Sequence, residues 1–258
     1  MKIGIVGLGL IGGSIYKKLT QLQYEVVGIS KSQNGKAENI TNDLSKLKDC
    51  DLIFVATPIN STIDKLKEIE KIVNKNTLVT DCCSVKEFLS KEKFGFKFIP
   101  SHPMAGTEFS GYENSFGELF NGAKWVITPI DETPTNLLEK IILDLGATPI
   151  ITTPQKHDEA VALISHMPMI IAQGLMKSSE NNNLAKKLAA SGFRDMTRLA
   201  MSNTEMAKDM IEYNHNNIEL SLLNLYKIIG DLIKNYPNEI TNIKEVREKM
   251  YKNGKNIL

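Results

Sequence analysis

The stretch Ile3-Gly4-Ile5-Val6-Gly7-Leu8-Gly9-Leu10-Ile11-Gly12-Gly13 decides how this chain folds. Its first four residues are typical of a buried strand, and its glycines have the spacing G-x-G-x-x-G. Apolar residues then recur at helical spacing up to a second apolar run, residues 24–30. Gly7 permits a tight turn, Gly9 lets the backbone approach a pyrophosphate, and Gly12 lets the helix lie close to the strand.

This strand–turn–helix pattern predicts a dinucleotide site. The helix that starts near Leu10 and Ile11 offers free N–H groups and the positive end of its dipole to a phosphate. We assign Ala56, Thr57 and Pro58, at the end of a later apolar run, to the same site.

The composition is that of an ordinary globular protein. The chain has 258 residues, 42% of them hydrophobic, and its net charge of +1 provides no general field to attract nucleic acid or an anionic membrane. The most apolar window, residues 160–176, contains polar residues and is too short for a convincing membrane span, so a buried helix is expected. Cys50, Cys82 and Cys83 lack metal-binding spacing and are expected to be buried thiols of a cytoplasmic protein without a metal site.

Apolar runs and helical patterns alternate along the first part of the chain. Strands are expected at residues 3–6, 24–30, 51–58, 77–82, 96–99, 124–128 and 147–152, and helices at 63–73, 85–93 and 135–145. This alternation predicts an α/β fold with a doubly wound, mostly parallel sheet. From residue 154 only helical periodicity remains, at residues 154–179, 184–201, 205–236 and 240–252. We therefore expect a dinucleotide-binding domain, residues 1–153, and a helical domain, residues 154–258, with a kink at Pro168.

The residues after the second strand bear on the choice of cofactor. An acidic residue there usually binds the adenosine ribose of NAD. This chain has Ser30 followed by Lys31, and a hydroxyl beside an ammonium suits the 2′-phosphate of NADP. NADP is therefore favoured over NAD, the alternative being a solvated basic loop.

A histidine follows another predicted strand, in the segment Ser101-His102-Pro103-Met104-Ala105-Gly106-Thr107-Glu108. Ligands of open parallel sheets bind at the carboxyl ends of the strands, so His102 is placed for acid–base chemistry. A histidine that only holds the loop is the alternative.

Several motifs together resemble one enzyme family, the prephenate and arogenate dehydrogenases of tyrosine synthesis. They are the glycine turn, residues 81–86 with Ser84, residues 101–108, His157-Asp158, Ser165-His166-Met167-Pro168 and Ser191-Gly192-Phe193-Arg194-Asp195-Met196-Thr197-Arg198. The likeness spans nearly the whole chain, and the pair Ser30-Lys31 is most similar to that of the cyanobacterial-type NADP-dependent arogenate enzymes.

The resemblance implies an oxidative decarboxylation of arogenate or prephenate by a Rossmann-type domain followed by an all-helical domain that forms a homodimer. The substrate hydroxyl loses its proton as hydride leaves the same carbon, and neutral imidazole suits that role near pH 7, since its ordinary pKa is about 6.5. The family motifs assign His102 as the base, Ser84 as its catalytic partner, and the following residues to the substrate: Arg198, Asp195, His157, His166 and Thr107. Arg198 and Asp195 are expected on one helical face, where the guanidinium would bind a carboxylate.

One position departs from the family pattern. Met169 stands where many members have a second histidine, Ser-His-x-Pro-His, which weakens the recognition of a keto acid and favours arogenate over prephenate. Two other hypotheses remain open at this point. One is a β-hydroxyacid or imine dehydrogenase on the same two-domain plan, with His102 merely structural, and the other is a non-catalytic NADPH-sensing protein.

Overall fold

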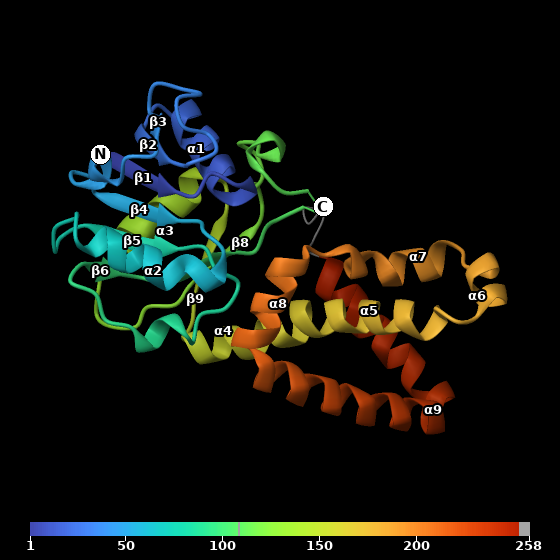
Figure 1. Cartoon of the computed structure of the whole chain (residues 1–258). Helices are drawn as coiled ribbons and strands as arrows, with labels where there is room; N and C mark the ends of the chain where they lie inside the picture. Colours follow the sequence, from blue (N-terminus) through green and yellow to red (C-terminus); the bar gives the residue numbers. More distant parts are fainter. Residues whose placement is uncertain (108, 253–258) are drawn as a thin grey trace.

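Figure 1 shows the computed structural model of the chain, which describes residues 1–107 and 109–252. Glu108 of the histidine motif and residues 253–258, at the end of the predicted helical domain, lie outside the described residues. The N-terminal part is built on a six-stranded sheet whose strands pair in parallel in the order β3-β2-β1-β4-β5-β6. The strands are β1 (Lys2–Val6), β2 (Glu25–Ile29), β3 (Ile40–Thr41), β4 (Leu52–Val55), β5 (Leu78–Asp81) and β6 (Lys97–Phe98). The predicted α/β, doubly wound fold class is thereby confirmed.

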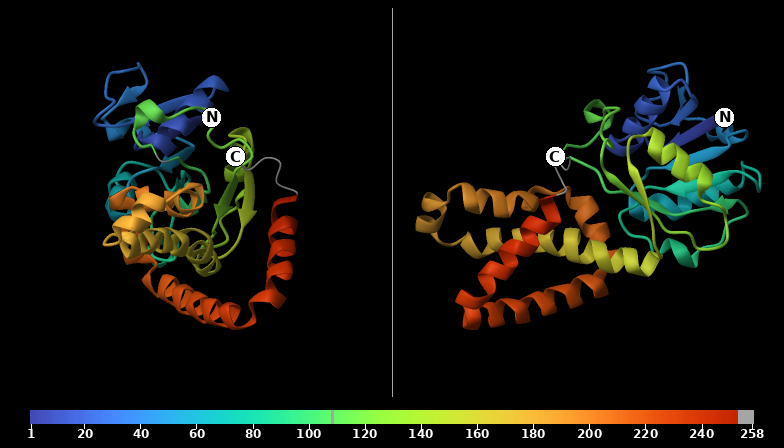
Figure 2. Two further views of the ribbon diagram at one scale, coloured as in Figure 1. Left: turned by 90° about the vertical axis from the view of Figure 1, so that its right-hand side faces the viewer. Right: turned by 180° about the vertical axis from the view of Figure 1, so that it is seen from behind.

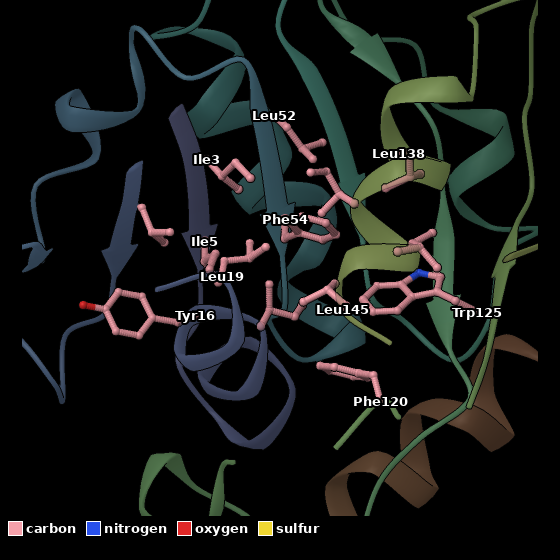
Figure 3. Packing of buried hydrophobic residues seen from close by; sticks show 14 of the residues in the cluster. Ile3, Ile5, Tyr16, Leu19, Leu52, Phe54, Phe120, Trp125, Leu138 and Leu145 are labelled. Carbon is pink, nitrogen blue, oxygen red and sulfur yellow. The ribbon is translucent and has the colours of Figure 1, made fainter. Parts of the chain in front are cut away.

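Both faces of the sheet are buried because alternate strand residues enter two separate apolar clusters. Ile3 and Phe54 belong to the cluster covered by α1 (Leu10–Gln21) and α3 (Asn136–Asp144), where Phe54 meets Trp125 edge to face (Figure 3). The neighbouring strand residues enter the second cluster, which α2 (Ile59–Glu70) covers together with residues of the C-terminal helices. The second cluster therefore contains residues of both the N-terminal sheet and the C-terminal helices.

The last three strands form a sheet of their own, where one continuous sheet was expected. The strand β7 (Ser101–Pro103) pairs antiparallel with β8 (Lys124–Ile127), and β8 pairs in parallel with β9 (Thr148–Ile151). His102 thus lies on a strand, opposite Val126, and not in a loop. Two prolines, at 100 and 103, hid this strand, because proline reads as a break in a sheet pattern.

The structure differs from the predicted elements at two other places. The polar stretch after β2 contains the two-residue strand β3, too short to be recognised from its sequence. The expected helix 85–93 is not formed, and only residues Leu89–Lys91 make a 3-10 turn. Val85 and Lys86 before that turn are both fully buried, so tertiary contacts override the helical pattern.

Helices alone make up the chain from Pro154 to Lys252. They are α4 (Pro154–Val161), α5 (Met167–Ser179), α6 (Asn183–Leu188), α7 (Ser191–Thr197), α8 (Thr204–Tyr213) and α9 (His215–Lys252). A π-helical turn, Ala162–His166, joins α4 to α5 and accommodates Pro168, at which a kink was expected. The expected helix 184–201 is divided into α6, α7 and a 3-10 turn, and the helix expected at 205–236 is interrupted at Asn214.

The C-terminal helices leave much apolar surface exposed. Figure 2 shows α9 changing direction along its length, and its backbone departs from helical geometry at Asn235. Among the described residues, one helix, Pro154–Ser179, is long and apolar enough to cross a membrane by length and composition, and 33% of its most apolar window is buried. The expectation of a buried helix there is therefore met only in part within a single chain.

Candidate functional site

The glycine turn has the geometry that its sequence predicted. Gly7 has φ +90°, in the region that favours glycine, and a Cβ on it would lie 2.5 Å from the Ala56 carbonyl oxygen. A Cβ on Gly12 would lie only 1.9 Å from the Gly7 carbonyl oxygen, which shows how closely α1 approaches β1. A Cβ on Gly9, by contrast, would meet no atom within 4 Å. Gly9 therefore leaves room for a ligand in front of the helix N-terminus.

A cavity of about 650 Å³ opens in front of this turn. Of the predicted cofactor residues, it is lined by Gly7, Gly9, Ser30, Ala56, Thr57 and Pro58, while Leu10, Ile11, Gly12 and Lys31 are not among its lining residues. Leu10 and Ile11 open the first turn of α1, and Gly12 follows them at the contact with Gly7.

The end of the cavity beside β2 is polar. Ser30, Ser32, Gln33 and Lys36 line it from the segment after β2, and Glu113 faces them from the segment after β7. The Lys36 ammonium lies 3.7 Å from the Glu113 carboxylate. Both Lys36 and Lys31 are exposed, but only Lys36 of the two is among the lining residues of the cavity. The segment after β7 thus reaches from His102 to the cavity wall.

His102 is the first member of a hydrogen-bonded chain. Its Nδ1 lies 2.9 Å from Nε2 of His157, and Nδ1 of His157 lies 2.7 Å from Oδ1 of Asp158. The rings of the two histidines meet edge to face. His157 and Asp158 are buried in α4, while His102 is partly exposed on β7. His157 therefore contacts the predicted base directly.

Asp158 joins its own helix α4 to two other segments of the chain. Its carboxylate accepts hydrogen bonds from the backbone N–H groups of Lys86 and Glu87, both at 2.8 Å, besides the bond from His157. Its backbone carbonyl accepts another, 2.8 Å long, from the Asn214 side chain at the break between α8 and α9. A buried carboxylate is expected to have such donors, because it would otherwise lose its hydration without compensation.

Lys86 is fully buried and paired. Its ammonium donates hydrogen bonds to the Asp81 carboxylate, at the end of β5, and to the Ser101 carbonyl oxygen, 2.7 Å away. The pair ties the end of β5 to the start of β7 and leaves a positive charge near His102.

The two histidines with altered pKa values are held neutral. Burial, above all, lowers the pKa of His102 well below its ordinary value of 6.5, and His157, Lys86 and His166 act in the same direction. Burial also lowers the pKa of His166 to about 4, although Asp158 opposes the shift. Both rings are therefore neutral at pH 7, as a proton acceptor must be.

Two buried polar atoms near this network have no hydrogen-bond partner within the described part of the chain. They are Oγ of Ser84 and Nε2 of His166. The other nitrogen of His166 lies 3.2 Å from the Asn214 side-chain nitrogen, which ties it to the Asp158 network. Buried polar atoms without partners are rare in native proteins, so both atoms indicate a place for a polar ligand.

The remaining predicted substrate residues lie on the surface of the single chain. Arg198 and Asp195 do not share an α-helical face as expected, because α7 ends at Thr197 and Arg198 opens a 3-10 turn. Asp195 lies 3.6 Å from Arg194 instead, and no partner of the Arg198 side chain is found in residues 1–107 and 109–252. Thr107 is exposed in the segment after β7, where its hydroxyl accepts a bond from the Phe109 N–H.

Sequence reasoning did not foresee the roles of Lys36, Lys86 and Asn214. Lys86 follows Ser84 by two residues in a motif, which was a signal. Asn214 sits inside a helical pattern and Lys36 in a polar stretch, so neither position carried one. In the described residues no group of three or more His, Cys, Asp or Glu side chains is placed to hold a metal ion.

Comparison with known proteins identifies the family in two adjoining matches. The family description "Prephenate dehydrogenase, nucleotide-binding domain" fits residues 25–150, and "Prephenate dehydrogenase, dimerization domain" fits residues 153–250. Prephenate dehydrogenase of Lactococcus lactis is 32% identical over an alignment that covers 96% of this chain and 77% of that protein.

Two solved structures resemble the whole chain. Synechocystis arogenate dehydrogenase has a TM-score of 0.81 at 30% identity, and A. aeolicus prephenate dehydrogenase, in complex with hydroxyphenyl propionate and NAD+, has a TM-score of 0.85 at 26% identity. Both alignments cover 98% of each chain. The chain therefore belongs to the prephenate, arogenate and cyclohexadienyl dehydrogenase family of oxidoreductases.

Proposed function

We propose that this chain catalyses the oxidative decarboxylation of arogenate to tyrosine with NADP as the hydride acceptor. The observation that carries the proposal is the place of His102 on β7, where its imidazole is hydrogen-bonded to the buried pair His157 and Asp158 and its pKa is lowered well below 6.5 by burial. A neutral imidazole can accept the proton of the substrate hydroxyl while hydride leaves the same carbon. Ser84, whose buried hydroxyl has no hydrogen-bond partner among the described residues, would bind the substrate hydroxyl or orient the imidazole.

The residues of the cavity fit a dinucleotide. Gly7 and Gly12 allow the close contact of strand and helix, and the open space at Gly9 admits a pyrophosphate to the N-terminus of α1, where Leu10, Ile11 and Gly12 present N–H groups. When bound, a nicotinamide dinucleotide supplies the acceptor of the hydride. In this proposal residues 1–153 hold the cofactor, and residues 154–258 complete the substrate site and form the dimer.

The preference for NADP rests on the polar end of the cavity. Ser30, Ser32 and Lys36 offer two hydroxyls and an ammonium there, which suits a phosphate on the ribose. Lys31 would contribute from its exposed position only if its side chain turned toward the cavity. Glu113 opposes an anion at this end, but its contact with Lys36 compensates part of its charge.

Substrate binding is assigned to groups with free hydrogen-bonding capacity. Nε2 of His166 is buried with no partner in residues 1–107 and 109–252, and Arg198 is exposed and can pair with a carboxylate in the manner typical of guanidinium groups. His157, Asp195 and Thr107 have internal partners, so their contribution would come through the geometry of the site.

Met169 supports arogenate as the substrate. It is buried in the cluster that also contains Cys83 and Val85, the neighbours of Ser84. A thioether there offers no donor to the carbonyl of a keto acid and no positive charge to repel an ammonium group. The second candidate function is that of a prephenate dehydrogenase, because several similar proteins carry that name.

The proposal includes a homodimer formed through the helices after Pro154, in the cytoplasm. Large apolar side chains are exposed on α5 and α9 and on the π-turn between α4 and α5, among them Ile164, Met176, Leu223, Tyr226 and Ile233. A second copy would cover these side chains, as contiguous exposed apolar surface often marks an interface. All three cysteines are free thiols, as suits a reducing compartment. Sedimentation equilibrium at micromolar concentration should show twice the chain mass.

The test of function is the reduction of NADP and of NAD by the purified chain with arogenate and with prephenate. The proposal expects the highest kcat/KM for arogenate with NADP. In His102→Asn, kcat should fall by about 10²- to 10⁴-fold while cofactor affinity stays within about twofold. Cofactor binding without turnover of either substrate would support the non-catalytic sensing protein and refute the proposal.

A further inference from the structure

The hydrogen bonds behind His102 determine which of its nitrogens carries a proton. The Asp158 carboxylate already accepts two backbone N–H groups, so it acts as an acceptor toward the ring beside it. His157 must then donate from Nδ1, which leaves its Nε2 as an acceptor when the ring is neutral. His102 in turn donates from Nδ1 to that atom, and its Nε2 keeps the free electron pair.

The same reasoning gives His166 the opposite form. The Asn214 side-chain nitrogen donates to the Asp158 carbonyl oxygen, and the Asn214 side-chain oxygen accepts from Asn217, so the orientation of the amide is fixed. Its second N–H points to Nδ1 of His166, which therefore accepts, and the proton of that ring lies on Nε2. One network thus sets an acceptor on His102 and a donor on His166.

A proton accepted by His102 would bring a charge to a place where burial and the nearby Lys86 ammonium disfavour it. His157 can take up the excess proton, because its Nε2 already accepts the hydrogen bond from Nδ1 of His102. When His102 binds the substrate proton at Nε2, its Nδ1 proton can pass to Nε2 of His157. The charge then rests on His157, which carries protons on both nitrogens, next to the buried carboxylate of Asp158.

We propose that His157 and Asp158 form a proton relay behind His102, in which they hold Nε2 of His102 unprotonated before the reaction and take over the charge during it. This inference rests on the proposed function, since it takes His102 as the base. Each transfer conserves protons: one leaves the substrate hydroxyl, one moves from His102 to His157, and none is lost. His157 and Asp158 are positioning residues, because neither is assigned a contact with the reacting atoms.

The first test needs no variant and no substrate. The chain contains four histidines, and exposed His215 serves as an internal reference, so nitrogen-15 spectra can resolve every ring. At pH 7.5 we expect a proton on Nδ1 of His102, on Nδ1 of His157 and on Nε2 of His166. A proton on Nε2 of His102 overturns the relay, whether or not the chain proves to be a dehydrogenase.

The second test separates a relay from a merely structural contact. In His157→Phe, kcat should fall about tenfold or more while KM for substrate and cofactor changes by less than about threefold, since the relay acts on the proton transfer. In this variant the nitrogen-15 spectrum should no longer show the proton of the His102 ring on Nδ1 alone. His215→Gln is the matched control and should retain the parent kcat. Unchanged kcat in a folded His157→Phe protein overturns the relay, whereas an inactive parent with the expected spectrum identifies the proposed function as the failure.

Discussion

Replacing Gly12 by alanine should lower the stability of the fold, whereas replacing Gly9 by alanine should lower the affinity for the cofactor. In Gly12→Ala the new Cβ would lie 1.9 Å from the Gly7 carbonyl oxygen, so backbone must move by about 1 Å to reach even the shortest tolerated contact of 3.0 Å. Because the opposing atom is backbone, we expect the upper end of the usual overpacking range, about 3 kcal/mol of unfolding free energy.

Gly9→Ala should fold like the parent. Gly9 has φ −87°, which an L-residue adopts, and its Cβ would meet nothing within 4 Å. The loss of stability should stay below about 1 kcal/mol, because Gly9 is the N-cap and alanine is a poorer cap. The added methyl group would however occupy the space in front of the helix N-terminus, and we expect cofactor affinity to fall at least about tenfold, or about 1.4 kcal/mol.

Urea unfolding and calorimetric titration of NADP and NAD into both variants would measure the two quantities. Gly12→Ala should shift the unfolding midpoint, and Gly9→Ala should shift the dissociation constant alone. Unchanged cofactor affinity in a stable Gly9→Ala protein would refute the placement of the pyrophosphate at this turn.

Four further outcomes are expected. Lys36→Ala should lower the kcat/KM ratio of NADP to NAD about tenfold, because it removes a charged hydrogen bond worth about 1.5 kcal/mol. Lys31→Ala should leave this ratio nearly unchanged. The reverse pattern would show that Lys31, and not Lys36, binds the phosphate. Met169→His should move the kcat/KM ratio toward prephenate by up to about tenfold, and an unmoved ratio would remove the argument for arogenate. Because the pKa of His102 lies below 6.5 in the folded chain, the acidic limb of the pH profile of kcat/KM should lie below pH 6.5. Because the pKa of His166 falls to about 4 in the folded chain, the unfolded state binds the proton more readily, and the unfolding free energy should decline by up to about 3 kcal/mol as pH drops from 6.5 to 4. Urea unfolding at several pH values measures this decline, which should be smaller in His166→Asn.

Local signals were sufficient for the glycine turn and for the longer strands of the six-stranded sheet. The glycine turn and the continuous apolar runs of β1 and β4 depend on neighbouring residues, so their pattern could be read directly. The strand that carries His102 could not be recognised, because its pairing with β8 is a long-range contact and its prolines suggest a loop. The same limit hid the failure of the helix at residues 85–93, where contacts with Asp158, 72 residues further along the chain, fix the backbone at Lys86.

The candidate site shows the same division. His102 and Ser84 could be named from motifs, yet the partner of His102 could not, since nothing local places His157 beside it. Lys36 illustrates a different limit: the segment after β2 contains two lysines on a polar surface, and only the folded chain distinguishes the one that lines the cavity.

Asn214, at the break between α8 and α9, also takes part in the hydrogen bonds of the site. Asn214 is the residue at which α8 ends, and its side-chain amide also determines which nitrogen of His166 carries the proton. One residue therefore sets both a helix boundary and the donor that His166 offers to a ligand. An aspartate side chain is similar in size to that of asparagine but offers only acceptors. An exchange of asparagine for aspartate at this junction would remove the donor to the Asp158 carbonyl oxygen and place a carboxylate oxygen beside Nδ1 of His166, so the proton of the neutral ring would move to Nδ1 and its Nε2 would become an acceptor.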